Sequence, residues 1–170
     1  MKLKTERAGA MKDMRPTTGK VMLALFNILG NISGCAFLDL FSGSGQIAAA
    51  AVKKGASSVV CVETERKRYA DIVKKVPREV RCLCMDVRRA LPLLVKKNEK
   101  FNIIFADPPY LLGWGDEFPR LLAQNSEILA ESGTVVFEHS AEEKAAVPDG
   151  WECSERTYGG TVLAFYGRKI

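Results

Sequence analysis

Four consecutive residues, Asp107-Pro108-Pro109-Tyr110, combine an acid, two prolines and an aromatic ring. Successive prolines donate no backbone hydrogen bond and hold the chain extended, so the Asp107 carboxylate and the Pro108 carbonyl are fixed acceptors. Together they could accept both hydrogens of an exocyclic amino group on a nucleic-acid base and direct its nitrogen lone pair at an electrophile. Tyr110 offers a ring face on which an extruded base could stack, worth ~1–3 kcal/mol. The four residues are predicted to be catalytic.

A second cluster of candidates is the run Asp39-Leu40-Phe41-Ser42-Gly43-Ser44-Gly45. Glycines there permit a sharp turn and a close approach of the backbone to a ligand, and the helix expected next would present free N–H groups. Glu63 lies twenty residues after Gly43, at the end of the next apolar run, where a carboxylate could bind two ribose hydroxyls. These features alone fit NAD and S-adenosylmethionine about equally.

Acidic residues favour S-adenosylmethionine over NAD. Asp39 precedes the glycines, where it would repel a pyrophosphate but attract a sulfonium compound that carries an α-amino group. Asp86 follows the third apolar run, where it could bind an adenine amino group, cap the next helix, or do both. The residues predicted to bind the cofactor are Asp39, Phe41, Ser42, Gly43, Ser44, Gly45, Glu63, Asp86 and Val87.

These residues would be positioned by alternating strands and helices. Apolar runs predict strands over 35–40, 58–62, 81–85, 101–106 and 134–139. Helical patterns lie between them, over 46–54, 65–76, from Val87 onward with Pro92 kinking or shortening the helix, and over 117–129. This alternation predicts a parallel α/β sheet of the Rossmann-like type, whose ligand crevice lies beyond the carboxyl ends of the strands.

The two ends of the chain depart from the alternation. Residues 151–158 and 161–167 are rich in β-forming side chains and flank Gly159-Gly160, which predicts an antiparallel hairpin at the edge of the sheet. Residues 21–29 have helical spacing, with Thr17 or Thr18 as the expected N-cap and Gly30 as the expected C-cap. This helix lies outside the core alternation and is free to cover a ligand mouth.

Composition indicates a cytoplasmic protein with a polyanionic partner and no membrane segment. The 170 residues carry a formal charge of +5, and residues 1–20 hold six basic and two acidic side chains, a net +4. No apolar run approaches the ~20 residues that a membrane span needs. The five cysteines lack the paired Cys-x-x-Cys spacing of a zinc site, so we expect reduced core residues and no metal.

Taken together, the 39–45 run and the 107–110 segment resemble class I amino-methyltransferases that act on nucleic acid. Within these, Arg15-Pro16-Thr17-Thr18, Leu25-Phe26-Asn27-Ile28-Leu29 and the tail Tyr158-Gly159-Gly160-Thr161 are similar to the RsmD family, from about residue 14 to the end. The resemblance implies methylation of the 2-amino group of a guanine in small-subunit ribosomal RNA, with S-adenosylmethionine as cofactor. It also implies a seven-stranded, mostly parallel sheet with the last strand antiparallel, and Asn27 near the substrate pocket.

The resemblance sets the expected organisation and partners. We expect one methyltransferase domain over residues 1–170, with a basic arm and amino-terminal helix in 1–30 and the Rossmann-like core in 35–170. The expected partner is ribosomal RNA or a small-subunit particle, and the expected state is a monomer. Only fourteen residues precede Arg15, where family members carry a longer β segment.

Three other functions remain open from the sequence. They are methylation of a DNA adenine or cytosine, an NAD-dependent oxidoreductase, and a catalytically silent RNA-binding assembly factor. Asp39 and the 107–110 segment disfavour the oxidoreductase. The complete set Asp39, Glu63, Asp107 and Tyr110 disfavours the silent factor.

Overall fold

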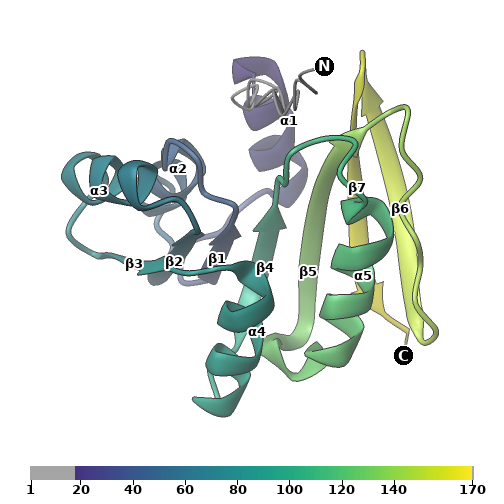
Figure 1. Ribbon diagram of the computed structural model, residues 1–170. Helices are drawn as coiled ribbons and strands as arrows, with labels where there is room; N and C mark the ends of the chain where they lie inside the picture. The colour runs from purple at the N-terminus through teal and green to yellow at the C-terminus, as the bar shows by residue number, and fades with distance from the viewer. Residues whose placement is uncertain (1–17, 170) are drawn as a thin grey trace, which may run out of the picture.

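The predicted alternation folds into one seven-stranded sheet with helices on both faces (Figure 1). The computed structural model describes residues 18–169. The strands are β1 (Ala36–Leu40), β2 (Ser58–Glu63), β3 (Val80–Cys84), β4 (Phe101–Ala106), β5 (Leu129–Ser140), β6 (Trp151–Tyr158) and β7 (Thr161–Arg168). The helices are α1 (Gly19–Leu29), α2 (Gln46–Lys53), α3 (Arg66–Lys75), α4 (Val87–Lys96) and α5 (Trp114–Gln124), with a short 3₁₀ helix, η1 (Ser126–Ile128), before β5.

The strand order β3-β2-β1-β4-β5-β7-β6 confirms the predicted Rossmann-like fold. Among themselves, the first five strands in chain order pair in parallel. β7 is antiparallel to both β5 and β6, so the last strand of the chain lies between them. The hairpin was predicted from Gly159-Gly160, but the insertion of β7 between β5 and β6 was not.

Each face of the sheet is covered by its own set of helices. One face packs against α4 and α5 through residues such as Leu40, Ile104 and Phe137. The other packs against α1, α2 and α3 through residues such as Phe37, Phe105 and Val136. We call these the α4–α5 face and the α1–α3 face. Because side chains alternate along a strand, Thr134 and Glu138 share the α1–α3 face with Val136.

The strand order also fixes where a ligand can bind. β1 is followed in the chain by β2 on one side, while its other neighbour is β4. Two helices leaving in opposite directions from neighbouring strands open a crevice at this switch point. Leu40 pairs with Ala106, so the residues after β1 and after β4 emerge side by side.

Several predicted boundaries were wrong. Helix α5 spans Trp114–Gln124 and contains Pro119, whereas a helix over 117–129 was predicted, and β5 begins at Leu129 rather than at Thr134. Helix α4 continues past Pro92 to Lys96. Its apolar side faces the core through residues such as Leu91 and Leu94, and this packing holds the helix together across the missing hydrogen bond.

The helix α1 begins and ends close to its predicted limits. The Thr18 Oγ1 accepts a hydrogen bond from the Val21 N–H at 3.3 Å, and Gly30 ends the helix with φ +67°. Val21, Leu25 and Phe26 are buried against the sheet. The predicted basic arm and Arg15-Pro16-Thr17 lie outside the described residues, apart from Thr18 and Lys20. Over the described part of the chain, no helix is long and apolar enough to cross a membrane.

Candidate active site

The 39–45 loop turns sharply after β1, and hydrogen bonds to β2 hold the turn. Phe41 has a left-handed backbone with φ 60°, unusual for a residue with a side chain, and Gly43 and Gly45 have φ values of 55° and 78°. The Ser42 N–H donates to the Val62 carbonyl at 2.9 Å, and the Val62 N–H donates to the Ser42 Oγ at 3.1 Å. These hydrogen bonds hold the loop against β2.

Asp39 is a buried acid beneath this loop. Its side chain is 1% exposed, and the structure gives its Oδ2 no hydrogen-bond partner among residues 18–169. Burial is the main cause that raises the pKa of Asp39 to about 8; hydrogen bonds from Ser42 and Ala48 oppose the shift, and the nearby Glu63 adds to it. An unpaired buried oxygen costs free energy unless a ligand bonds to it. A ligand that carries an amino group or another cation fits this position.

Glu63, at the end of β2, has its carboxylate engaged by the protein. Its Oε2 accepts from the Gly43 N–H at 3.0 Å, and its Oε1 accepts from the Glu65 N–H at 2.9 Å. Arg68 Nε lies 3.2 Å from the same Oε1. The Glu63 carboxylate is therefore fixed beside the 39–45 loop by hydrogen bonds from the backbone and from Arg68.

Asp86 and Val87 join β3 to α4. Asp86 is the N-cap of α4 and accepts from the Arg88 N–H at 2.8 Å, which confirms the predicted capping interaction. The Arg88 guanidinium bridges Asp86 and Glu117, with Nη1–Oδ2 at 3.0 Å and Nη2–Oε2 at 2.8 Å. Val87 is buried in the α4–α5 face. Asp86 is partly exposed at this edge of the sheet, so capping leaves it accessible to a ligand.

Arg88 and Trp114 close the α4–α5 side of the crevice, and the sequence did not predict this. Trp114 is the first residue of α5 and only 8% exposed. Its ring meets Phe41 edge to face, with centroids 4.7 Å apart, and the Arg88 guanidinium lies 4.5 Å from the Trp114 ring centroid. The strained Phe41 is therefore held by an aromatic neighbour as well as by β2.

The 107–110 segment follows β4 beside the 39–45 loop. Pro108 is buried, and Asp107, Pro109 and Tyr110 are half-buried. The Tyr110 hydroxyl donates to Glu138 Oε1 at 3.1 Å and lies 3.0 Å from Thr161 Oγ1. Burial above all, and the negative charges of Glu138 and Asp107, raise the pKa of Tyr110, so this hydroxyl keeps its proton.

Glu138 and Thr161 were not among the predicted site residues. Glu138 is 4% exposed and ends the apolar run Val135-Val136-Phe137. An acid at the carboxyl end of an otherwise apolar strand is the signal that could have identified it, because buried charges are costly unless they have partners. Thr161 begins β7, directly after Gly159-Gly160.

Asn27 was expected near the substrate pocket from the family resemblance. It is exposed on α1, on the side of the helix opposite Leu25, which is fully buried. Its role in a substrate pocket stays a prediction.

His139, the only histidine of the chain, is 2% exposed at the end of β5. Its Nδ1 lies 2.8 Å from the Ser140 carbonyl, and its ring packs on Phe137.

All five cysteines are free thiols, and Cys61 and Cys82 lie in register on β2 and β3 with their sulfurs 3.0 Å apart.

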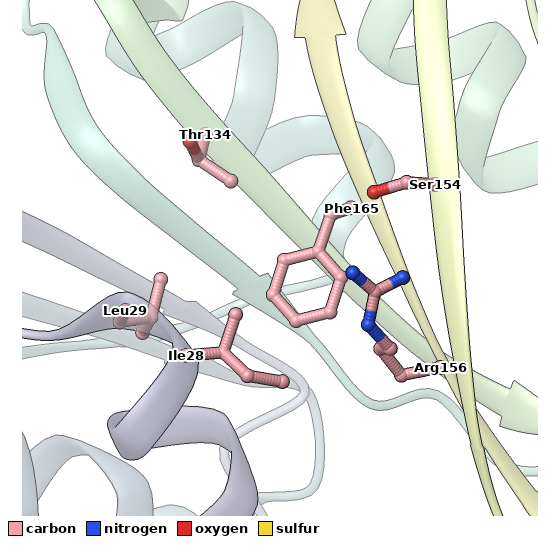
Figure 2. Close-up of a pocket in the computed structure, with 6 residues that line it drawn as sticks. All are labelled: Ile28, Leu29, Thr134, Ser154, Arg156 and Phe165. Atoms are coloured by element: carbon pink, nitrogen blue, oxygen red, sulfur yellow. The ribbon is translucent and has the colours of Figure 1, made fainter.

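A groove of about 290 Å³ lies on the α1–α3 face, between the end of α1 and the hairpin (Figure 2). Ile28 and Leu29 of α1 form one wall, while Ser154 and Arg156 of β6 form the other. The floor is formed by Thr134 and the half-buried ring of Phe165. Arg156 is the charged residue among those that line the groove. Glu138 lies on the same sheet face, further along β5.

Comparison with known proteins decides the family. A profile of the family described as "Conserved hypothetical protein 95" matches residues 2–167. Ribosomal RNA small subunit methyltransferase D of Escherichia coli (strain K12) is 30% identical over 152 residues, which are 88% of this chain and 76% of that protein. The chain belongs to the RsmD family of methyltransferases.

Solved structures described as methyltransferases share this fold. The structure described as "Putative methyltransferase yhhF from Escherichia coli" superposes with a TM-score of 0.78 at 27% identity, over 92% of this chain and 90% of its own. The structure described as "SMU.776, a putative methyltransferase complexed with SAH" has a TM-score of 0.67, over 87% of this chain and 49% of its own. At 17% identity the second likeness concerns the fold alone. The fold is thus the class I methyltransferase fold expected of RsmD.

Proposed function

We propose that this protein uses S-adenosylmethionine to methylate the 2-amino group of a guanine in small-subunit ribosomal RNA. The observation that carries the proposal is the pairing of Leu40 with Ala106. Through it, the loop that would hold the cofactor and the segment that would hold the base emerge side by side at the switch point. Membership of the RsmD family and the name of the Escherichia coli relative support RNA as the substrate.

The cofactor would be held by groups that suit its charges. S-adenosylmethionine supplies an electrophilic methyl group on a positively charged sulfur. Asp39, with its unpaired Oδ2, is suited to the cationic methionine end, and Glu63 to the ribose hydroxyls. Binding at Glu63 would replace or share its bonds to Gly43 and Arg68. Asp86 would accept from the adenine amino group while it continues to cap α4.

The target amine would be oriented by the 107–110 segment. The lone pair of a base amino nitrogen is delocalised into the ring, which makes it a poor nucleophile. Hydrogen bonds from its two hydrogens to the Asp107 carboxylate and the Pro108 carbonyl would point the lone pair toward the cofactor. The same acceptors would favour the positive charge that develops on the nitrogen as the methyl group transfers. Tyr110 would stack on the base and exclude water.

The surface around this site suits a polyanion. The chain carries a formal charge of +5, and the groove of Figure 2 contains the exposed Arg156 beside the Phe165 ring. We propose that nucleotides next to the target base follow this groove, since cationic and aromatic side chains together favour single-stranded nucleic acid.

Calorimetric titration with S-adenosylmethionine and with NAD tests the cofactor. We expect the wild type to bind S-adenosylmethionine and to show no measurable affinity for NAD. Glu63→Ala should weaken the binding of S-adenosylmethionine by ~1–3 kcal/mol, because the ribose hydroxyls lose their acceptor. Glu127→Ala, an exposed acid in η1 remote from the loop, serves as the matched control. Equal wild-type affinities for the two cofactors would overturn the methyltransferase mechanism proposed here.

A further inference from the structure

The Tyr110 hydroxyl lies between two side chains from distant parts of the chain. It donates to Glu138 Oε1 at 3.1 Å, and Thr161 Oγ1 lies 3.0 Å away. Tyrosine has one hydroxyl hydrogen, so the consistent arrangement has Thr161 donating to Tyr110 while Tyr110 donates to Glu138. One residue is on β5 and the other begins β7, so the ring is tied at its tip to two strands.

Glu138 is unusual in its surroundings. Val136 and Leu163, which share its sheet face, are fully buried, and Glu138 itself is 4% exposed. A valine or leucine at this position would stabilise such a core more simply, because burying a carboxylate is costly even when it is hydrogen bonded. The pairing of Ala106 with Phe137 puts Glu138 next to the 107–110 segment. The presence of an acid here is therefore better explained by its hydrogen bond to Tyr110 than by the stability of the sheet.

Thr161 gives the carboxyl-terminal hairpin a connection to the same ring. It pairs with Ser140 on β5 and with Tyr158 on β6, so its position is fixed on both sides. Gly159, with φ 61°, forms the turn that brings β7 back along the sheet directly before it. The turn at Gly159-Gly160 thus places the Thr161 hydroxyl next to the Tyr110 hydroxyl.

We infer that Glu138 and Thr161 are positioning residues that fix the Tyr110 ring in the orientation needed to stack on the target base. This inference rests on the proposed function, in which Tyr110 contacts the base. A tyrosine held only by its own side-chain torsions would sample several ring orientations. Two hydrogen bonds at its tip select one orientation before RNA arrives, so less free energy is spent on ordering the ring when the base binds.

The test is a double-mutant cycle on Tyr110→Phe and Thr161→Val, with a second cycle on Tyr110→Phe and Glu138→Leu, which removes the acceptor of the Tyr110 hydroxyl. Each single change should lower the single-turnover rate of methyl transfer to RNA, or raise the RNA concentration needed for half the maximal rate, by about 5- to 30-fold. Thr161→Ser keeps the hydroxyl and should restore most of the loss. Thr157→Val, an exposed threonine on the same hairpin, is the matched control. Cofactor affinity should be the same in all of them.

The decisive result is the coupling within each cycle. If Thr161 and Glu138 act through the Tyr110 hydroxyl, Thr161→Val and Glu138→Leu should have little further effect in the Tyr110→Phe background. Additive effects, or losses in which cofactor affinity and the free energy of unfolding fall in parallel with the rate, would overturn the inference.

RNA affinity, measured on the same variants without turnover, separates the two proposals. A wild type that binds RNA with the expected coupling but transfers no methyl group would contradict the proposed function and leave the positioning role supported. Normal methyl transfer with uncoupled variants would contradict the positioning role alone. A wild type that neither binds RNA nor transfers a methyl group would contradict both.

Discussion

At Asp39, the cost of burial and the demands of the proposed chemistry oppose each other. The carboxyl group is 1% exposed and keeps one oxygen unpaired, an arrangement that no purely structural role requires. From the sequence, Asp39 was predicted to lie at the crevice because it comes shortly before the glycines of the 39–45 loop. The sequence could not predict the depth of burial, which depends on β1 lying inside the sheet between β2 and β4.

The raised pKa of Asp39 leads to a testable pH dependence. Burial favours the neutral acid in the folded chain, so the folded pKa of about 8 lies above the ordinary value of 3.8. The resulting stabilisation is complete below pH ~4 and is lost as the pH rises toward 8, by up to ~1.4 kcal/mol per pH unit. Asp39→Asn removes this titration. Urea unfolding of both proteins from pH 5 to 8 should show the variant gaining relative stability with pH, and a constant difference would contradict the buried acid.

Asp107→Ala tests the orientation of the amine. It removes one of two acceptors, so we expect the single-turnover rate of methyl transfer to fall by ~10²–10⁴. Affinity for S-adenosylmethionine should survive, because Asp39, Glu63 and Asp86 remain. Asp116→Ala, an exposed acid on α5, is the matched control and should behave as the wild type. A near wild-type rate for Asp107→Ala, or a loss of cofactor as large as that in Glu63→Ala, would rule out the orienting role.

Among the elements, the 39–45 loop combines backbone strain with tight packing. Gly45 has φ 78°, and a Cβ there would lie 2.8 Å from Val76 Cγ1 and 3.2 Å from Ile72 Cγ2. The close packing against the end of α3 therefore needs a glycine even without a ligand. The sequence favoured glycine for ligand approach, and the structure adds this second reason.

Gly34 provides a matched control for Gly45. It has the same φ of 78°, but a Cβ there would meet nothing within 4 Å. Gly34→Ala should lose ~1–2 kcal/mol of unfolding free energy from the left-handed backbone, and Gly45→Ala a further ~1–3 kcal/mol from overpacking. Thermal or urea unfolding measures both. Equal losses would show that Ile72 and Val76 yield freely and that packing does not constrain the loop.

The elements most accurately predicted were those with strong local signals. The turn at Gly159-Gly160 and the caps Thr18 and Gly30 defined their elements to within a few residues. The start of α5 was missed because Gly113 and Gly115 flank Trp114, and glycine-rich sequence is typical of loops. Here Trp114 is buried against Phe41, and this tertiary contact outweighs the low helix propensity of its neighbours.

On the scale of the whole molecule, the residues of the crevice lie at the ends of four strands, and the sequence predicted that these ends share one edge of the sheet. The groove could not be predicted in this way, because it depends on tertiary structure. Its walls come from α1 and β6, which are 120 residues or more apart in the chain, and no local pattern links them. Thr161 was missed for the same reason, because it is an ordinary residue until β7 inserts beside β5 and carries it to Tyr110. Glu138 differs, since an acid after the apolar run 135–137 is a local signal that could have identified it.

The groove makes a prediction about RNA binding. Arg156→Ala should weaken RNA binding and reduce the slope of log affinity against log salt by ~0.7–0.9 if one phosphate contact is lost. Arg78→Ala, an exposed arginine between α3 and β3, removes the same charge away from the groove and should leave the slope unchanged. Fluorescence anisotropy at several salt concentrations measures the slopes. An identical slope for both variants would show that the groove does not contact phosphate.

The most direct test of the proposed methylation is to incubate ribosomal RNA with the protein and isotopically labelled S-adenosylmethionine. The nucleosides of the RNA are then analysed by mass spectrometry. The RNA should come from cells that lack this gene, so that the target site is unmodified. We expect labelled guanosine that carries its methyl group on the 2-amino nitrogen, at one position of the small-subunit RNA, and far slower labelling with Asp107→Ala. Label on adenosine, cytidine or a ring nitrogen, or no label in any nucleoside, would contradict it.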